Sequence, residues 1–138
     1  MKRRVSEKTL ENRINKWKHI LKLDGWSIRF KFVAPMKMEE KDKTILAMVK
    51  HCSPNEKVAD LLFNNKSPSY EGFDSSWNLD TLIIHELIHV HLYEKSELLA
   101  QGLTDDVVEI FEILEEFICD SFAKIIFDTI SLEKKSIQ

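Results

Sequence analysis

The sequence is poor in the residues that mark fibrous, flexible or disulfide-stapled chains. Its 138 residues include three Gly, three Pro and two Cys, too few for a collagen-like, low-complexity or disulfide-framework protein. The two cysteines, Cys52 and Cys119, form no CxxC pair, and we therefore expect a reducing, cytoplasmic compartment. The 43% hydrophobic and 31% charged residues are typical of a globular protein, and the length predicts a single domain over residues 1–138.

A basic excess and a long apolar run are also missing. The chain has 20 Lys and Arg residues against 23 Asp and Glu residues, a net charge of −3, whereas nucleic-acid binding through phosphate contacts needs positive charge. The most apolar stretch, Leu79 to Tyr93, contains acidic residues and histidines and falls short of the ~20 apolar residues that cross a bilayer. The basic N-terminus is not followed by the apolar segment of a signal peptide. We therefore expect neither nucleic acid nor a membrane as a partner.

The first half of the chain predicts one helix followed by three strands. Apolar residues recur every three or four positions from Leu10 to Leu21, which is typical of one stripe of an amphipathic helix. Apolar and polar residues then alternate from Trp26 to Phe32, which is the period of a half-buried strand. Thr44 to His51 and Lys57 to Asn64 also have strand character, and the turn sequence Ser53-Pro54-Asn55 between them predicts a hairpin.

The second half begins with a predicted loop and a central helix. Residues Asn65 to Asn78 are polar, and a connection of this length raises the suspicion of a functional loop. A helix follows, capped by Asn78 or Asp80 and running to about Glu94. Its apolar residues cover nearly the whole circumference, so we expect it in the middle of the fold.

The last helix is predicted from about Asp105 to Ser131, followed by a frayed tail over Leu132 to Gln138. An apolar side normally faces the core; here that side is centred on Leu114, Ile118, Ser121 and Ile125. A second line combines a carboxylate with two small residues that let another helix approach closely, at Glu116, Cys119 and Ala123. Together the elements predict an α+β domain: an N-terminal helix, a small three- or four-stranded sheet, a central helix and a long C-terminal helix.

One motif in the central helix carries recognisable chemistry: His85-Glu86-Leu87-Ile88-His89, an HExxH pattern. Residues four apart lie one above the other on a helix, so both imidazoles can direct a nitrogen at one Zn²⁺. Glu86 lies beside such a metal, where it can take a proton from a metal-activated water. In a chain with five His the motif arises by chance roughly 0.02 times. The alternative is a helix whose histidines are hydrogen-bonded in the core or face solvent.

A catalytic zinc site needs a third protein ligand and an open position for water. The sequence offers several candidates: His19, His51, His91, Glu109, Glu112, Glu115 and Glu116. His91 is two residues from His89, so it points elsewhere on the helix. Glu116 heads the line of small residues and can reach a metal on a facing helix. Glu115 borders the apolar side of the last helix, and spacing alone does not decide between the two glutamates.

His85 to His89, followed after about 27 residues by Glu116-Phe117-Ile118-Cys119-Asp120-Ser121-Phe122-Ala123, resembles the ImmA/IrrE family of small zinc peptidases. In that family the second motif reads E-x-x-A-N-x-F-A, and its glutamate is the third zinc ligand. The Glu, Phe and Ala match, whereas Cys119-Asp120 replaces Ala-Asn. The resemblance covers roughly Trp26 to Ile126. It implies a zincin-like fold of the minimal gluzincin type, with zinc held by His85, His89 and Glu116.

The function that the resemblance implies is that of a zinc metallopeptidase. Glu86 is then the catalytic base: it deprotonates the metal-activated water that attacks a peptide carbonyl and passes the proton to the leaving amine. Because relatives of the ImmA type cleave a specific repressor, the implied partner is a protein or peptide substrate, with a transcriptional repressor as one candidate. By the same resemblance, Val58 to Asn64 is the edge strand that binds extended peptide. The alternatives are a zincin-fold binding or regulatory protein without general protease activity, and a metal-free helical partner protein.

A zinc peptidase also needs a group that stabilises the developing oxyanion. The sequence leaves four candidates open: Tyr93, Tyr70, His91 and His51. Asp120 is a candidate for a hydrogen bond that holds a ligand histidine from behind; the alternative is a surface charge. Neither cysteine is paired with a base by any recognisable pattern, so a thiol nucleophile is not expected.

Overall fold

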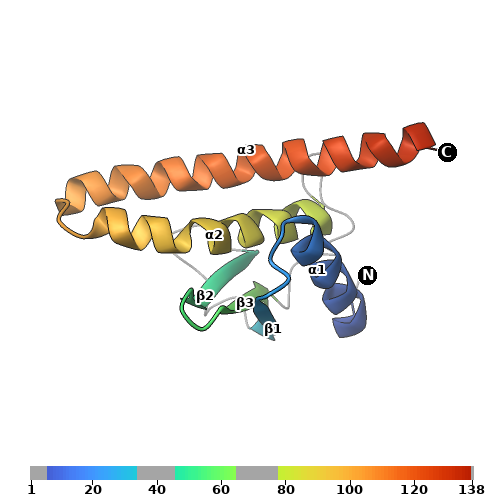
Figure 1. The fold of residues 1–138 in the computed structure, drawn as a ribbon, viewed down its shortest axis with the longest axis horizontal. Coiled ribbons are helices and arrows are strands. Elements are labelled where there is room, and N and C mark those ends of the chain that lie inside the picture. Colours follow the sequence, from blue (N-terminus) through green and yellow to red (C-terminus); the bar gives the residue numbers. More distant parts are fainter. Residues whose placement is uncertain (1–5, 34–45, 65–77, 138) are drawn as a thin grey trace.

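Three layers build the structure, with helix α2 in the middle, α3 on one side of it and the sheet with α1 on the other (Figure 1). The computed structural model describes residues 6–33, 46–64 and 78–137, without the side chains of 94–100 and 134–137. The elements are α1 (Glu7–Ile20), β1 (Ser27–Val33), β2 (Ala47–Ser53), β3 (Val58–Asn64), α2 (Leu79–Ala100) and α3 (Asp105–Ile137). Three helices and a three-stranded mixed sheet in the described residues confirm the α+β class. None of the described helices is long and apolar enough to cross a membrane.

Helix α1 lies where the apolar stripe predicts it, and a hydrogen bond ties it to α2. Ser6 caps its first turn, because the Ser6 side chain accepts a backbone N–H at 3.1 Å. The buried stripe consists of Leu10, Ile14 and Trp17. The indole N–H of Trp17 donates to Asp80 at 2.8 Å, so the buried ring satisfies its only donor on the first turn of α2.

The sheet has the order β1-β3-β2, with β1 parallel and β2 antiparallel to β3. The predicted hairpin of the second and third strands is confirmed, with β2 ending at Ser53 rather than His51; the part of this strand predicted at Thr44 lies outside the described residues. The expectation that Val58 to Asn64 forms the edge is wrong, because β3 pairs on both sides. Its residues are also the most buried of the three strands, as a central strand requires.

Helix α2 is central, as its all-round apolar surface predicts. Asn78 is its cap: the Asn78 Oδ1 accepts hydrogen bonds from the backbone N–H of Thr81 at 2.9 Å and from its hydroxyl at 3.1 Å. Every residue from Leu79 to Val90 is buried or half-buried. The helix runs to Ala100, beyond the predicted end near Glu94. The predicted loop before it lies, up to residue 77, outside the described residues.

Helix α3 runs back along α2 in the opposite direction (Figure 1). Its buried line is Cys119 and Ala123, each with no exposed surface, as the small-residue line allows. The apolar side centred on Leu114, Ile118 and Ile125 does not face the core; these side chains are 38–58% exposed. Small side chains let two helix backbones approach closely. Helix α3 therefore packs on α2 through Cys119 and Ala123 rather than through its larger apolar side. The helix continues to Ile137, so the predicted frayed tail from Leu132 is helical.

Candidate metal centre

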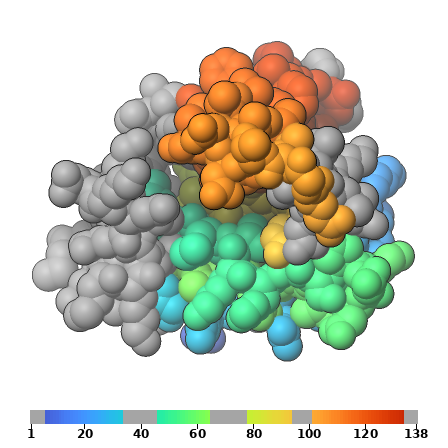
Figure 2. All heavy atoms as spheres, turned by 90° about the vertical axis from the view of Figure 1, so that its left-hand side faces the viewer, coloured from blue at the N-terminus to red at the C-terminus, as the bar shows by residue number. Residues whose placement is uncertain are grey.

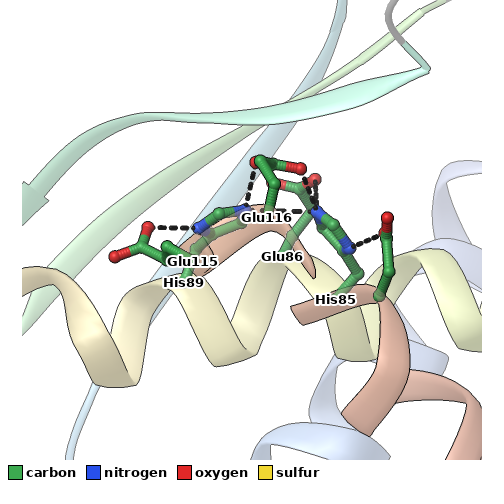
Figure 3. A network of polar contacts seen from close by, with 6 residues as sticks. His85, Glu86, His89, Glu115 and Glu116 are labelled. Carbon is green, nitrogen blue, oxygen red and sulfur yellow. Dashed lines mark hydrogen bonds and ion pairs between the residues drawn. The ribbon is translucent and has the colours of Figure 1, made fainter. Parts of the chain in front are cut away.

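The two histidines of the HExxH motif lie side by side on the face of α2 that meets α3 (Figure 3). The Nε2 atoms of His85 and His89 are 3.1 Å apart, because four residues of helix stack the two rings one turn apart. The His85 side chain is 8% exposed and that of His89 is 15% exposed. Two mostly buried imidazoles thus aim their Nε2 atoms at one point beside α3.

Glu116 reaches the same point from α3. One of its carboxylate oxygens lies 2.7 Å from Nε2 of His89, and the other lies 3.3 Å from Nε2 of His85. The close approach at Cys119 and Ala123, one and two turns further along α3, brings this carboxylate onto the histidines. Of the two glutamates that spacing left open, Glu116 is the one whose carboxylate faces both Nε2 atoms.

The outer nitrogens of both rings meet carboxylates as well. Nδ1 of His89 donates a hydrogen bond to Glu115 at 2.7 Å, and Nδ1 of His85 lies 2.8 Å from Asp120. A carboxylate at Nδ1 favours the tautomer that leaves Nε2 free as a ligand, and it fixes the ring orientation. The sequence leaves Asp120 open as a partner of a ligand histidine or as a surface charge, and its carboxylate approaches His85 without hydrogen-bond alignment; the contact of Glu115 is not among the sequence predictions. The position of Glu115 next to Glu116, on the side of α3 toward His89, is the sequence signal for its contact with His89.

The three inner donors fit a divalent metal. Ligand atoms of His85, His89 and Glu116 all lie within 4.8 Å of one another. Two ligands 2.0–2.1 Å from a tetrahedral zinc are about 3.3 Å apart, close to the separations found here. Two imidazoles and a carboxylate are also a donor set that zinc accepts. Within the described residues no fourth His, Cys, Asp or Glu joins this group, which matches a metal site with an open position.

Glu86 lies beside the donors without joining them. Its carboxylate is 3.7 Å from Nε2 of His85, and the side chain is 5% exposed. Burial raises the pKa of the Glu86 carboxyl, and the nearby histidines oppose that shift. A carboxyl whose pKa is shifted toward neutrality can both accept and return a proton.

The charges of the inner groups are strongly coupled. Burial lowers the pKa of His85, but the carboxylates of Glu116 and Glu86 outweigh it and raise the pKa. Burial also lowers the pKa of His89, but hydrogen bonds with Cys119 and Glu116 raise it to about 11. Hydrogen bonds from both histidines hold the pKa of Glu116 well below its usual range. The carboxylate therefore attracts positive charge, and a divalent cation can replace the ring protons.

The remaining sequence candidates are dispersed. His91 is exposed and its ring contacts the backbone carbonyl of Leu21. His51 is the register partner of Asp60 and lies on the sheet face away from the core residues Ala59 and Leu61. Tyr70 is outside the described residues. Tyr93, half-buried one turn after His89 on α2, is therefore the oxyanion candidate left within the described residues.

The other candidate metal ligands lie away from the centre, and the buried cysteine beside it is not a nucleophile. His19 is exposed and pairs with Asp24 at 2.7 Å. Glu109 and Glu112 are exposed on the first turns of α3. Burial raises the pKa of the Cys119 thiol, so this cysteine is protonated near neutral pH and is a poor nucleophile, as expected.

Comparisons with models of known protein families, with curated proteins and with solved structures found no match to this chain.

Proposed function

We propose that this protein is a zinc-dependent metallopeptidase of the minimal gluzincin type, with a zincin-like fold. The observation that carries the proposal is the convergence of two Nε2 atoms and one carboxylate, from His85, His89 and Glu116, beside the buried Glu86. A structural zinc site is normally closed by four protein ligands, whereas a catalytic one has three. The three-donor group therefore favours catalysis over a structural role.

Exposure at the centre also favours catalysis. The side chain of Glu116 is 60% exposed and that of Asp120 is 46% exposed, so the group is open to solvent on the α3 side. Figure 2 shows a recess between α3 and β2 with α2 at its floor. Within the described residues β2 is an edge strand, and it contacts α2. An extended peptide paired with β2 would pass beside the centre, which moves the peptide-binding role from β3 to β2.

Each side chain of the centre has a separate role in the proposed peptide hydrolysis. His85, His89 and Glu116 would hold the zinc ion, which when bound would supply a Lewis acid to polarise the peptide carbonyl and to acidify a water. Glu86 accepts the proton of the attacking water and later gives it to the leaving amine, which its raised pKa suits. Glu115 and Asp120 hold the two imidazoles in place from behind. We further propose a protein substrate, and the resemblance to the ImmA/IrrE family makes a transcriptional repressor the first one to test.

The experiment combines metal content with proteolysis of a general substrate. Purified wild-type protein is analysed by elemental mass spectrometry after zinc loading and dialysis, and then incubated with fluorescein-labelled casein. We expect about one zinc per chain, lost in His89→Ala and Glu116→Ala. We expect Glu86→Gln to keep the zinc and to lose proteolysis by about 10²-fold or more. The matched control is Glu112→Ala, an exposed glutamate on the same helix.

The outcomes separate the alternatives. Wild-type protein without stoichiometric zinc would contradict the proposal and favour a metal-free partner protein. Full proteolysis by Glu86→Gln would exclude Glu86 as the base. Zinc without cleavage of casein would be followed by cleavage assays on repressor proteins. Failure there as well would favour a zincin-fold binding or regulatory protein.

A further inference from the structure

The side of α3 that α2 does not cover is apolar along most of its length. Its exposed large side chains, 38–68% accessible each, are Ile110, Phe111, Ile113, Leu114, Phe117, Ile118, Phe122, Ile125 and Leu132. Single exposed apolar residues are ordinary, but a contiguous patch above a few hundred Å² marks an interaction surface. At roughly 200 Å² for each fully exposed side chain, about half exposure leaves on the order of 900 Å² here.

Packing among the residues that the structure describes does not account for this surface. Helix α3 uses Cys119 and Ala123 against α2, and within the described residues α2 is the element it contacts most. A helix that is apolar on opposite sides is normally covered on both. The outer side of α3 therefore has the composition of a buried surface and the exposure of a free one.

We propose that the outer face of α3 pairs with the same face of a second copy of the chain, with the two helices antiparallel. The inference does not rest on the proposed function. A helix of 33 residues is about 50 Å long, enough to carry such an interface alone. The exposed apolar area also reaches the about 800 Å² that each partner contributes to a stable interface.

The spacing of the outer residues suits a helix pair. Positions 111, 114, 118, 121, 125, 128 and 132 alternate steps of three and four, the repeat of a seam between two long helices. Five of these positions are large and apolar: Phe111, Leu114, Ile118, Ile125 and Leu132. Ser121 lies near the middle of the seam, where a twofold axis would pass in an antiparallel pair.

The charges favour the antiparallel direction. Residues 105–121 of α3 contain seven acidic residues and no Lys or Arg, whereas residues 122–137 contain three Lys and two acidic residues. A parallel pair would place the two acidic halves side by side, and like charges across an interface are unfavourable. An antiparallel pair places each acidic half beside the half that carries the lysines. The face thus complements itself in charge as well as in apolar area.

The first test is the mass of the protein in solution. Sedimentation equilibrium of the full chain across a micromolar concentration series should give a dimer. The double variant Ile118→Glu with Ile125→Glu should be monomeric, with a dimer Kd weakened at least about 100-fold, because four carboxylates would be buried in the seam. The matched control is Asn12→Glu with Asn15→Glu, two exposed positions on α1 with the same charge change. Far-UV circular dichroism verifies that each variant is folded, which is expected because all four positions are exposed.

The second test is the direction of the pair. Leu114→Cys and Ile125→Cys proteins are treated with a short bis-maleimide crosslinker, separately and mixed, with wild type as the background for Cys52 and Cys119. An antiparallel pair crosslinks mainly in the mixture, because Leu114 of one copy then lies near Ile125 of the other. With the twofold axis at Ser121, two Leu114 residues are separated by fourteen residues of helix, about 21 Å.

Several results would overturn the proposal. A monomeric wild type at the highest concentration would refute pairing, as would a double variant that stays dimeric or a control that is equally disrupted. Masses above the dimer would indicate open association. Crosslinking of Leu114→Cys alone, and not of the mixture, would refute the antiparallel direction.

Discussion

Asp120 lies 2.8 Å from Nδ1 of His85, on the far side of the ring from the nitrogen that faces Glu116. Glu115 accepts a hydrogen bond from Nδ1 of His89, whereas the approach of Asp120 to His85 is that of an ion pair without hydrogen-bond alignment. Each of the two histidines is thus flanked at both of its ring nitrogens by carboxylates of α3. One helix supplies a ligand and the two groups that orient the other ligands, so the geometry of the centre depends on how α3 packs against α2.

Removing the rear contacts should weaken metal binding without abolishing it. We expect Glu115→Gln and Asp120→Asn each to reduce zinc affinity about 10- to 100-fold, because groups behind a ligand histidine orient it and increase its basicity. Competition with a chromogenic chelator measures the effect, with Glu112→Gln as the matched control. Affinities equal to that of the control would show that these carboxylates do not support the site.

Zinc affinity should rise with pH. The pKa of His89 is raised to about 11 by its hydrogen bonds with Cys119 and Glu116, and that of His85 is raised by Glu116 and Glu86, so at neutral pH the metal-free His89 ring holds a proton that the metal must displace. Each displaced proton changes affinity about tenfold per pH unit. We expect zinc binding to weaken at least about 10-fold per unit as pH falls from 8 to 6, after correction for the chelator. An affinity independent of pH would contradict protonated rings in the metal-free protein.

A larger side chain at the contact between α2 and α3 should lower both the stability of the fold and the zinc affinity of the centre. Ala123 has no exposed surface, so Ala123→Leu should push α3 away from α2. We expect a loss of about 1–3 kcal/mol in the free energy of unfolding, measured by urea denaturation, together with weaker zinc binding. Thr129→Leu adds a large side chain at an exposed position of the same helix and should leave both quantities nearly unchanged. Unaltered zinc affinity in the Ala123 variant would show that helix spacing does not control the centre.

The cap of α2 should contribute to stability independently of the metal. Asn78 accepts two hydrogen bonds from Thr81 at the start of the helix. We expect Asn78→Ala to lower the free energy of unfolding by about 1 kcal/mol, with thermal unfolding of metal-free protein as the measurement. Asn12→Ala, at an exposed position inside α1, serves as the comparison. Equal stability of wild type and the Asn78 variant would mean that the cap is replaced by another group.

Local patterns determined the elements and the core of the candidate site. The HExxH spacing places two imidazoles on one helix face, because 3.6 residues per turn bring positions four apart together. Period-two alternation and turn residues likewise predicted strands and a hairpin, and the structure has them at β1, β2 and β3 with small shifts at their ends. These features depend on neighbours along the chain, which is why sequence alone reveals them.

Tertiary packing decided which face of α3 packs against α2 and which strands pair in the sheet. Periodicity identified two lines on α3, but only the docking of α2 selected the line of Cys119 and Ala123 over the larger side of Leu114 and Ile118. That choice brought Glu116 to the inner nitrogens and left Glu115 at an outer one. Strand order was similarly open, because the pairing of β3 with β1 joins segments distant in sequence. Sequence period defines which residues share a face, whereas the partner of that face depends on shape and close approach between elements that are far apart in the chain.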